Sequence, residues 1–129
     1  MKIIVIEDDT SISEMYRMKC ELSGITVQTA SNGKEGLLML ESYTPDVVLL
    51  DLMMPEMNGS EFMHVFRQNE KFKNTPVIVL TNTGAEEAPE GLWGTGISDF
   101  IIKADCTPAE VIQKVKDVFE TSTQAGSVA

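Results

Sequence analysis

The stretch Val47-Val48-Leu49-Leu50-Asp51 gives the first indication of how this chain folds. Four apolar residues follow one another without a polar break, and the run then ends at an aspartate. A continuous apolar run is typical of a strand that is covered on both faces, whereas a strand with one solvated face alternates apolar and polar residues. The sequence therefore predicts a buried parallel strand at 47–50, with a carboxylate at its end.

Similar apolar runs lie on both sides of this stretch, and they alternate with segments of helical spacing. The other predicted strands are Ile3–Ile6, Ile25–Thr29, Val77–Leu80 and Phe100–Ile102. The clearest helical stripe consists of Val111, Ile112, Val115, Val118 and Phe119. This alternation predicts five strand–helix units in a doubly wound α/β fold, which is a five-stranded parallel sheet with right-handed crossovers and helices on both faces.

Several helix starts are marked in the sequence. Thr107-Pro108-Ala109-Glu110 is a capping box with proline at the first helical position, and Ser11 with Glu14 forms a similar pair before the first helix. The turn signals Asn32-Gly33 and Asn58-Gly59 precede the second and third predicted helices.

The segment between Thr81 and Ser98 fits a helix poorly. A fourth helix is expected there, yet the segment contains Pro89, Gly91, Gly94 and Gly96. Glycine costs about 1 kcal/mol and an interior proline about 3 kcal/mol in a helix. We therefore expect a short, late or mobile helix, which is either part of a switch or an irregular helix held by packing.

The length of 129 residues suits one domain, which we assign to residues 1–120. Residues 121–129 are small and polar, and we expect them to form a flexible C-terminal tail.

Composition narrows the classes of function. The net charge is −10 and no stretch gathers Lys and Arg on one face, so we expect no direct binding of nucleic acid. The two cysteines, Cys20 and Cys106, are too few for a disulfide framework and suggest free thiols. The sequence shows neither a signal peptide nor a membrane-spanning window, so we expect a cytoplasmic location and no membrane association.

Polar residues stand at the ends of four of the predicted strands. In open parallel sheets, ligands bind outside the carboxyl ends of the strands, so these residues are expected to lie together. They are Glu7, Asp8 and Asp9 after the first strand, Asp51 after the third, Thr81 and Asn82 after the fourth, and Lys103 after the fifth.

Each residue type in this group suits a step of phosphoryl transfer. Clustered carboxylates repel one another unless a cation neutralises them, and Mg²⁺ prefers oxygen ligands. Asp51 can act as a nucleophile toward phosphorus and form an acyl phosphate. Lys103, Thr81 and the backbone N–H of Asn82 can stabilise the charge on the phosphoryl oxygens.

Four motifs together resemble the receiver domain of two-component response regulators, over about residues 2–120. The resemblance implies a flavodoxin-like (βα)5 arrangement with strand order 2-1-3-4-5. The motifs are Ile-Val-Ile-Glu-Asp-Asp at 4–9, Val-Val-Leu-Leu-Asp-Leu-Met-Met-Pro-Glu-Met-Asn-Gly at 47–59, Pro-Val-Ile-Val-Leu-Thr at 76–81 and Asp-Phe-Ile-Ile-Lys at 99–103.

The resemblance also implies a metal site. Asp51 is the expected phosphoacceptor, and Asp8 is expected to bind Mg²⁺ directly. Glu7 is expected to act through water or from behind the direct ligands, and the backbone carbonyl of Met53 is the expected third protein ligand. Asp9 matches a position that the family does not need for metal, and we interpret it as a residue of the loop or helix start.

The remaining implied roles concern the switch. Lys103 is expected to pair with the phosphoryl group and Thr81 to move its hydroxyl onto it, while Phe100 turns inward when Thr81 moves. Two positions depart from the family pattern. Asn82 stands where a small residue is usual and is expected to narrow the approach to Asp51, and Ala104 follows Lys103 where many members have proline.

The resemblance implies a signalling module and not an enzyme that turns over a separate substrate. A sensor histidine kinase or a histidine phosphotransfer protein is the expected phosphodonor. The surface of the fourth helix, fifth strand and last helix is expected to bind a downstream protein. Neither His64, the only histidine, nor Trp93, the only tryptophan, is assigned to the site; Trp93 either packs on the sheet or anchors a partner.

Three alternatives are weaker. A phosphohydrolase with an aspartate nucleophile typically has a second aspartate two residues later, where this chain has Met53. A receiver that only binds partners usually lacks the acids or the lysine, which are all present here. A flavin-binding domain would need Ser, Thr and Gly after the first strand, where three acids stand.

Overall fold

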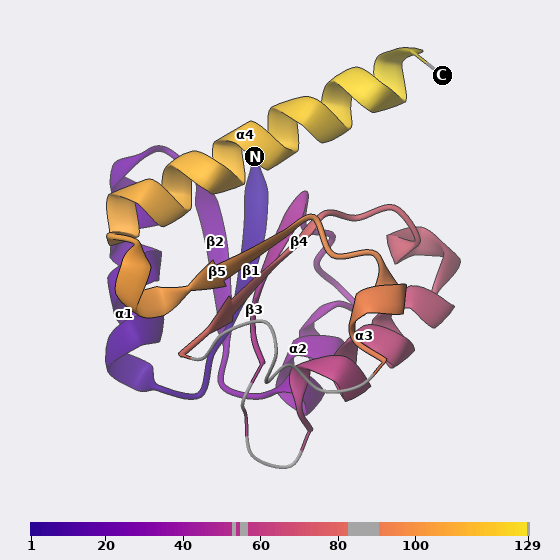
Figure 1. Cartoon of the computed structure of the whole chain (residues 1–129), viewed down its shortest axis with the longest axis horizontal. Coiled ribbons are helices and arrows are strands. Elements are labelled where there is room, and N and C mark those ends of the chain that lie inside the picture. Colours follow the sequence, from indigo (N-terminus) through magenta and orange to yellow (C-terminus); the bar gives the residue numbers. More distant parts are fainter. Residues whose placement is uncertain (53, 55–56, 83–90, 129) are drawn as a thin grey trace.

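The structure, a computed structural model, describes residues 1–52, 54, 57–82 and 91–128. Its five strands are β1 (Lys2–Ile6), β2 (Thr26–Ala30), β3 (Val47–Asp51), β4 (Val77–Thr81) and β5 (Asp99–Ile102). They form one parallel sheet in the order β2-β1-β3-β4-β5 (Figure 1). The predicted fold class and strand order are therefore confirmed.

Four α-helices lie in the described part of the chain. They are α1 (Thr10–Leu22), α2 (Gly33–Met39), α3 (Gly59–Gln68) and α4 (Pro108–Val128). Short 3₁₀ helices follow α3 at Glu70–Phe72 (η1), precede β5 at Trp93–Thr95 (η3) and follow β5 at Lys103–Asp105 (η4). The last predicted helix is thus α4 in the structure.

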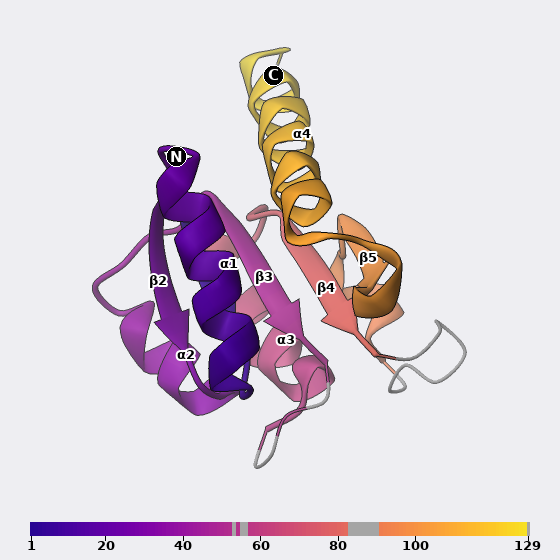
Figure 2. The same cartoon turned by 90° about the vertical axis from the view of Figure 1, so that its left-hand side faces the viewer.

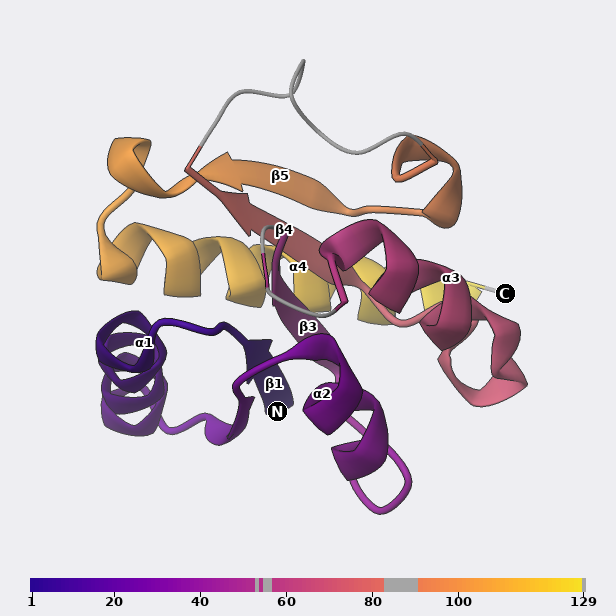
Figure 3. The same cartoon turned by 90° about the horizontal axis from the view of Figure 1, so that it is seen from below.

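The helices cover both faces of the sheet. Successive residues of a strand point to opposite faces, so Ile4 and Ile6 of β1 pack with α3 while Ile3 and Val5 pack with α1 and α4. Both groups are fully buried, which explains why the strands read as continuous apolar runs. Figure 2 shows α1 and α4 on the near face, and Figure 3 shows α1 and α2 on opposite sides of β1.

Side chains cap the N-termini of the helices, and for α1 the capping residue is not the one that the sequence predicted. The capping boxes at Asn58 and Thr107 are present. The predicted pair of Ser11 and Glu14 is wrong, because Asp9 caps α1 by accepting a hydrogen bond from the backbone N–H of Ile12. An aspartate in the extended conformation satisfies that N–H better than a residue already inside the helix.

The segment before β5 contains no α-helix among its described residues. Residues 83–90, where much of the expected fourth helix would lie, fall outside the described part of the chain. Within residues 91–98 the helical structure is the 3₁₀ turn η3 at Trp93–Thr95, with Gly91 before it and Gly96 after it at positive φ angles of 84° and 81°. Glycine adopts this left-handed conformation without the strain that other residues suffer.

The last helix continues past Glu120, where we predict that the domain ends, and runs to Val128. The hydroxyl of Thr121 donates a hydrogen bond to the carbonyl of Asp117 one turn earlier, within the same helix. The flexibility of residues 121–129 stays a prediction. None of the helices in the described ranges is both long and apolar enough to cross a membrane.

Gly59 sets how closely α3 approaches the end of β3. A Cβ atom at this position would lie 2.6 Å from Cδ2 and 3.0 Å from the backbone Cα of Leu52. We expect Gly59→Ala to lower the free energy of unfolding by about 1–3 kcal/mol, because backbone cannot move aside as a side chain can. Urea denaturation measures the change.

Gly94→Ala is the matched control for this prediction. A Cβ atom there would meet nothing within 4 Å, so the expected change is within about 0.5 kcal/mol. Equal urea midpoints for wild type and Gly59→Ala would contradict the predicted close packing.

Candidate functional site

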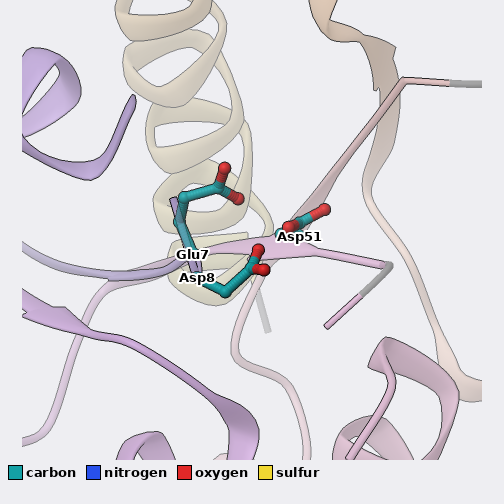
Figure 4. A group of neighbouring side chains, drawn as sticks. All are labelled: Glu7, Asp8 and Asp51. Atoms are coloured by element: carbon teal, nitrogen blue, oxygen red, sulfur yellow. The ribbon is translucent and has the colours of Figure 1, made fainter. Parts of the chain in front are cut away.

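Three carboxylates meet at the carboxyl end of the sheet. Glu7 and Asp8 directly follow β1, and Asp51 is the last residue of the neighbouring strand β3. A carboxylate oxygen of each lies within 4.8 Å of one from each of the others. Figure 4 shows the three side chains grouped at this point. The predicted acidic cluster is therefore formed by the fold.

The three carboxylates differ in exposure. Glu7 and Asp51 expose only 2% and 4% of their surface, whereas Asp8 is exposed. Buried carboxylates are unfavourable unless they are paired or hydrogen-bonded. The cluster thus has a buried side, formed by Glu7 and Asp51, and a solvent-exposed side at Asp8.

Lys103 supplies the cation inside the cluster. Its Nζ lies 2.8 Å and 3.0 Å from the two carboxylate oxygens of Glu7 and 3.5 Å from Oδ1 of Asp51. Only 10% of its side chain is exposed. Lys103 is therefore bound mainly by Glu7, while its ammonium also lies close to the carboxylate of Asp51.

The environment changes the acidity of Asp51. Burial, together with the hydrogen bond and the negative charge of Glu7, raises the pKa of Asp51 to about 8, although Lys103 acts in the opposite direction. With all four groups ionised, three carboxylates and one ammonium carry a formal charge of −2. A bound dication would balance this charge.

The donor set fits Mg²⁺. All three side chains offer carboxylate oxygens, which hard cations prefer, and the group contains no sulfur or imidazole ligand. Met53, whose carbonyl is the remaining predicted ligand, lies outside the described residues. The structure thus brings together Glu7, Asp8 and Asp51, while the part assigned to Met53 stays a prediction.

The predicted switch residues lie on β4, which is next to β3, and on β5, the edge strand beyond it. Thr81 ends β4 and is 1% exposed, and it is paired in register with Ile102 of β5. Phe100 of β5 is half-buried and packs against the core on the α2 and α3 side. Asn82 is exposed next to Thr81. Residues 103–105 form η4, and the described residues contain no cis peptide bond.

Tyr16 of α1 is a neighbour of the site that the sequence analysis missed. It is buried and packs in the same core cluster as Cys106. Burial first, and then the negative charges that include Glu7 and Asp51, raise the pKa of Tyr16 to about 12. The available signal was spacing, since Ile12, Tyr16 and Cys20 lie four residues apart on one helix face.

Comparisons with known proteins agree with this geometry. The family model of the response regulator receiver domain matches residues 3–116. The phosphate regulon transcriptional regulatory protein PhoB of Rhizobium meliloti is 36% identical over 116 residues, which cover 89% of this chain and 50% of the relative. The transcriptional regulatory protein ResD of Bacillus subtilis is 35% identical over 123 residues, or 95% of this chain and 50% of the relative.

Solved structures show the same likeness. The receiver domain of the Francisella response regulator 1452 has a TM-score of 0.80 and 31% identity, covering 94% of this chain and 98% of that one. The chain spans about half the length of the two transcriptional regulators, and nearly all of the Francisella domain. Since the family model spans most of the chain and the sheet order and acidic cluster agree with the sequence motifs, the chain belongs to the response regulator receiver domain family.

Proposed function

We propose that this receiver domain is a switch that accepts a phosphoryl group on Asp51. The observation that carries the proposal is the buried carboxylate of Asp51 beside Lys103 and next to two further carboxylates. A carboxylate held in this way is a nucleophile with a cation already at hand for the incoming phosphoryl oxygens.

The donor in this proposal is a phosphohistidine of a sensor histidine kinase or of a histidine phosphotransfer protein. An Asp51 oxygen attacks phosphorus, the P–N bond breaks, and its electron pair returns to the imidazole. Asp8 and Asp51, with Glu7 nearby, would hold Mg²⁺, which when bound neutralises charge on the phosphoryl oxygens.

In this proposal Lys103, which pairs with Glu7, also contacts the phosphoryl group. It already lies 3.5 Å from Oδ1 of Asp51, so a small displacement away from Glu7 brings its ammonium to a phosphoryl oxygen. The hydroxyl of Thr81 then moves toward the phosphoryl group, and Phe100 turns inward behind it. These movements bias an equilibrium between two surfaces and require no new fold.

The proposed output is binding of a downstream protein at the surface of β5, α4 and the segment before β5. The net charge of −10 disfavours direct contact with nucleic acid by this chain, although its two relatives are named as transcriptional regulators. In this proposal the chain acts in the cytoplasm and catalyses only its own phosphorylation and dephosphorylation.

Intact mass spectrometry tests this function directly. The chain is incubated with acetyl phosphate, a small phosphodonor, in the presence of Mg²⁺ or of a chelator. We expect a mass increase of one phosphoryl group that depends on Mg²⁺ and maps to Asp51 after reductive trapping and proteolysis. No mass increase with Mg²⁺ present, or a label on another residue, would overturn the proposal.

A further inference from the structure

A basic pocket lies away from the acidic cluster, between the C-terminal half of α3 and the glycine-rich turn before β5. It has a volume of about 430 Å³. Its lining residues are His64, Arg67, Gln68 and Lys73 on one side and Gly94, Thr95 and Gly96 on the other. This volume is at the lower end of the range for small-molecule sites, which is about 300–1,000 Å³.

The charge of this pocket runs against the composition of the chain. Acidic residues outnumber Lys and Arg by 20 to 10, yet the described lining holds two of those cations, the only histidine and no carboxylate. The ion pairs of the described residues involve neither Arg67 nor Lys73. Among the described residues, no ion pair with an acid cancels the positive charge of the pocket.

Arg67 is held rigidly at the base of the pocket. Its Nε donates to the carbonyl of Thr95 at 2.8 Å, and Nη2 donates to that of Gly96 at 2.7 Å. Nη1 donates to the carbonyls of Phe72 and Thr75 at 2.7 Å and 2.8 Å. These bonds leave one N–H of Nη2 without a described acceptor, because each Nη carries two hydrogens.

Two of the three residues on the opposite wall, Gly94 and Gly96, have no side chain. A Cβ atom at Gly94 would meet nothing within 4 Å, and at Gly96 it would meet only the Arg67 guanidinium, at 3.7 Å. Glycine is used where a ligand approaches the backbone closely. The glycines that make Thr81–Ser98 a poor helix thus leave an open wall beside three basic side chains.

A structural role for these cations accounts for only part of the arrangement. Arg67 lies in the last turn of α3, where a cation balances the negative end of the helix dipole. Lys73, however, lies beyond α3 and beyond η1, and is exposed. The helix end therefore explains Arg67 but not the convergence of Lys73 and His64 on the same space.

We propose that this pocket binds the phosphate group of a small phosphate ester, with Lys73 and His64 contacting the phosphate beside Arg67. The volume exceeds the size of a phosphate ion and leaves room for a small organic group. The site is separate from Asp51, since Gly59 begins α3 beside Leu52 and Arg67 lies about 12 Å further along the helix, at 1.5 Å per residue. It does not depend on the phosphorylation of Asp51.

Nuclear magnetic resonance titration of the full chain tests this site. Inorganic phosphate and glycerol 3-phosphate are added separately at constant ionic strength without Mg²⁺, with potassium chloride as the reference salt. We expect saturable shifts of the amides of the lining residues with glycerol 3-phosphate. Equal saturation by inorganic phosphate would show that the phosphate group alone supplies the affinity.

Variants at exposed positions make the test specific. Lys73→Ala and His64→Ala should each weaken binding roughly fivefold or more, because each removes a contact to a charged group. Lys71→Ala is the matched control, since Lys71 is exposed close to Lys73 but does not line the pocket. Shifts that do not saturate, that chloride reproduces, or that weaken equally in Lys71→Ala and Lys73→Ala would overturn the proposal.

Discussion

Replacing Asp51 with asparagine is expected to abolish phosphorylation and, at the same time, to stabilise the metal-free protein at neutral pH. The first effect follows because the proposed function makes the Asp51 carboxylate the nucleophile, and an amide cannot replace it. The second follows because the wild type places two buried carboxylates, Glu7 and Asp51, around one ammonium. In Asp51→Asn, Lys103 and Glu7 form a complete ion pair.

The pH dependence gives the sign of this stabilisation. The pKa of Asp51 rises from 3.8 to about 8 in the folded state, so the native protein keeps a proton that the unfolded chain has lost. The free energy of unfolding of the metal-free protein should therefore fall as the pH rises from 3.8 toward 8. Asp51→Asn should reduce this slope and gain on the order of 2 kcal/mol at pH 8.

Urea denaturation between pH 5 and pH 8 in a chelating buffer measures both quantities. This pH range covers most of the interval between the unfolded and the folded pKa of Asp51, within which the two states bind different numbers of protons. Asp9→Asn is the control, because it removes a carboxylate from the same loop while asparagine still caps α1. Mg²⁺ should raise the melting temperature of the wild type more than that of Asp51→Asn. Equal pH slopes for wild type and Asp51→Asn would contradict the assigned environment of Asp51.

Replacing Lys103 with alanine is expected to have the opposite effect on stability. The change leaves Glu7 and Asp51 buried without their cation, and removal of one partner from a buried pair costs about 3 kcal/mol or more. That is a large part of the total stability of a typical domain, which is about 5–15 kcal/mol. Mg²⁺ should restore part of the loss, because the dication replaces the missing positive charge.

Two comparisons separate this effect from a general loss of charge. Lys114→Ala breaks an ion pair with Asp99 at 3.9 Å, whose side chains are 43% and 36% exposed, so it should cost less than about 1 kcal/mol. Adding Glu7→Gln to Lys103→Ala should recover stability relative to Lys103→Ala alone. A chelator-treated Lys103→Ala variant with the wild-type urea midpoint would refute the pairing described for Lys103.

Much of the fold follows from local sequence patterns. Strands that are buried on both faces produce uninterrupted apolar runs, so Val47–Leu50 and Val77–Leu80 could be recognised without a structure. The start of α1 was misassigned because Ser11 and Asp9 both suit a cap, and only the backbone conformation selects between them. A local sequence pattern thus predicts the presence of a helix or strand better than it predicts the residue at which that element begins.

That the acids and Lys103 lie together at one edge of the sheet could also be predicted, because the topology requires it. In a parallel sheet all carboxyl ends lie at one edge, so acids after β1 and β3 must approach one another, as must Lys103 after β5. Tyr16 was missed because it belongs to a helix, and this rule applies only to strand ends.

The sequence by itself determined the fold class, the strand that carries Asp51 and the residue types at the sheet edge. Only the tertiary structure decided that Lys103 bonds mainly to Glu7, 96 residues away, that Glu7 is buried while Asp8 is exposed, and that Arg67 and Lys73 line one pocket. Periodicity reports which face of an element is buried. Distances between side chains on different elements depend on how the whole sheet and its helices pack, and no local pattern contains that information.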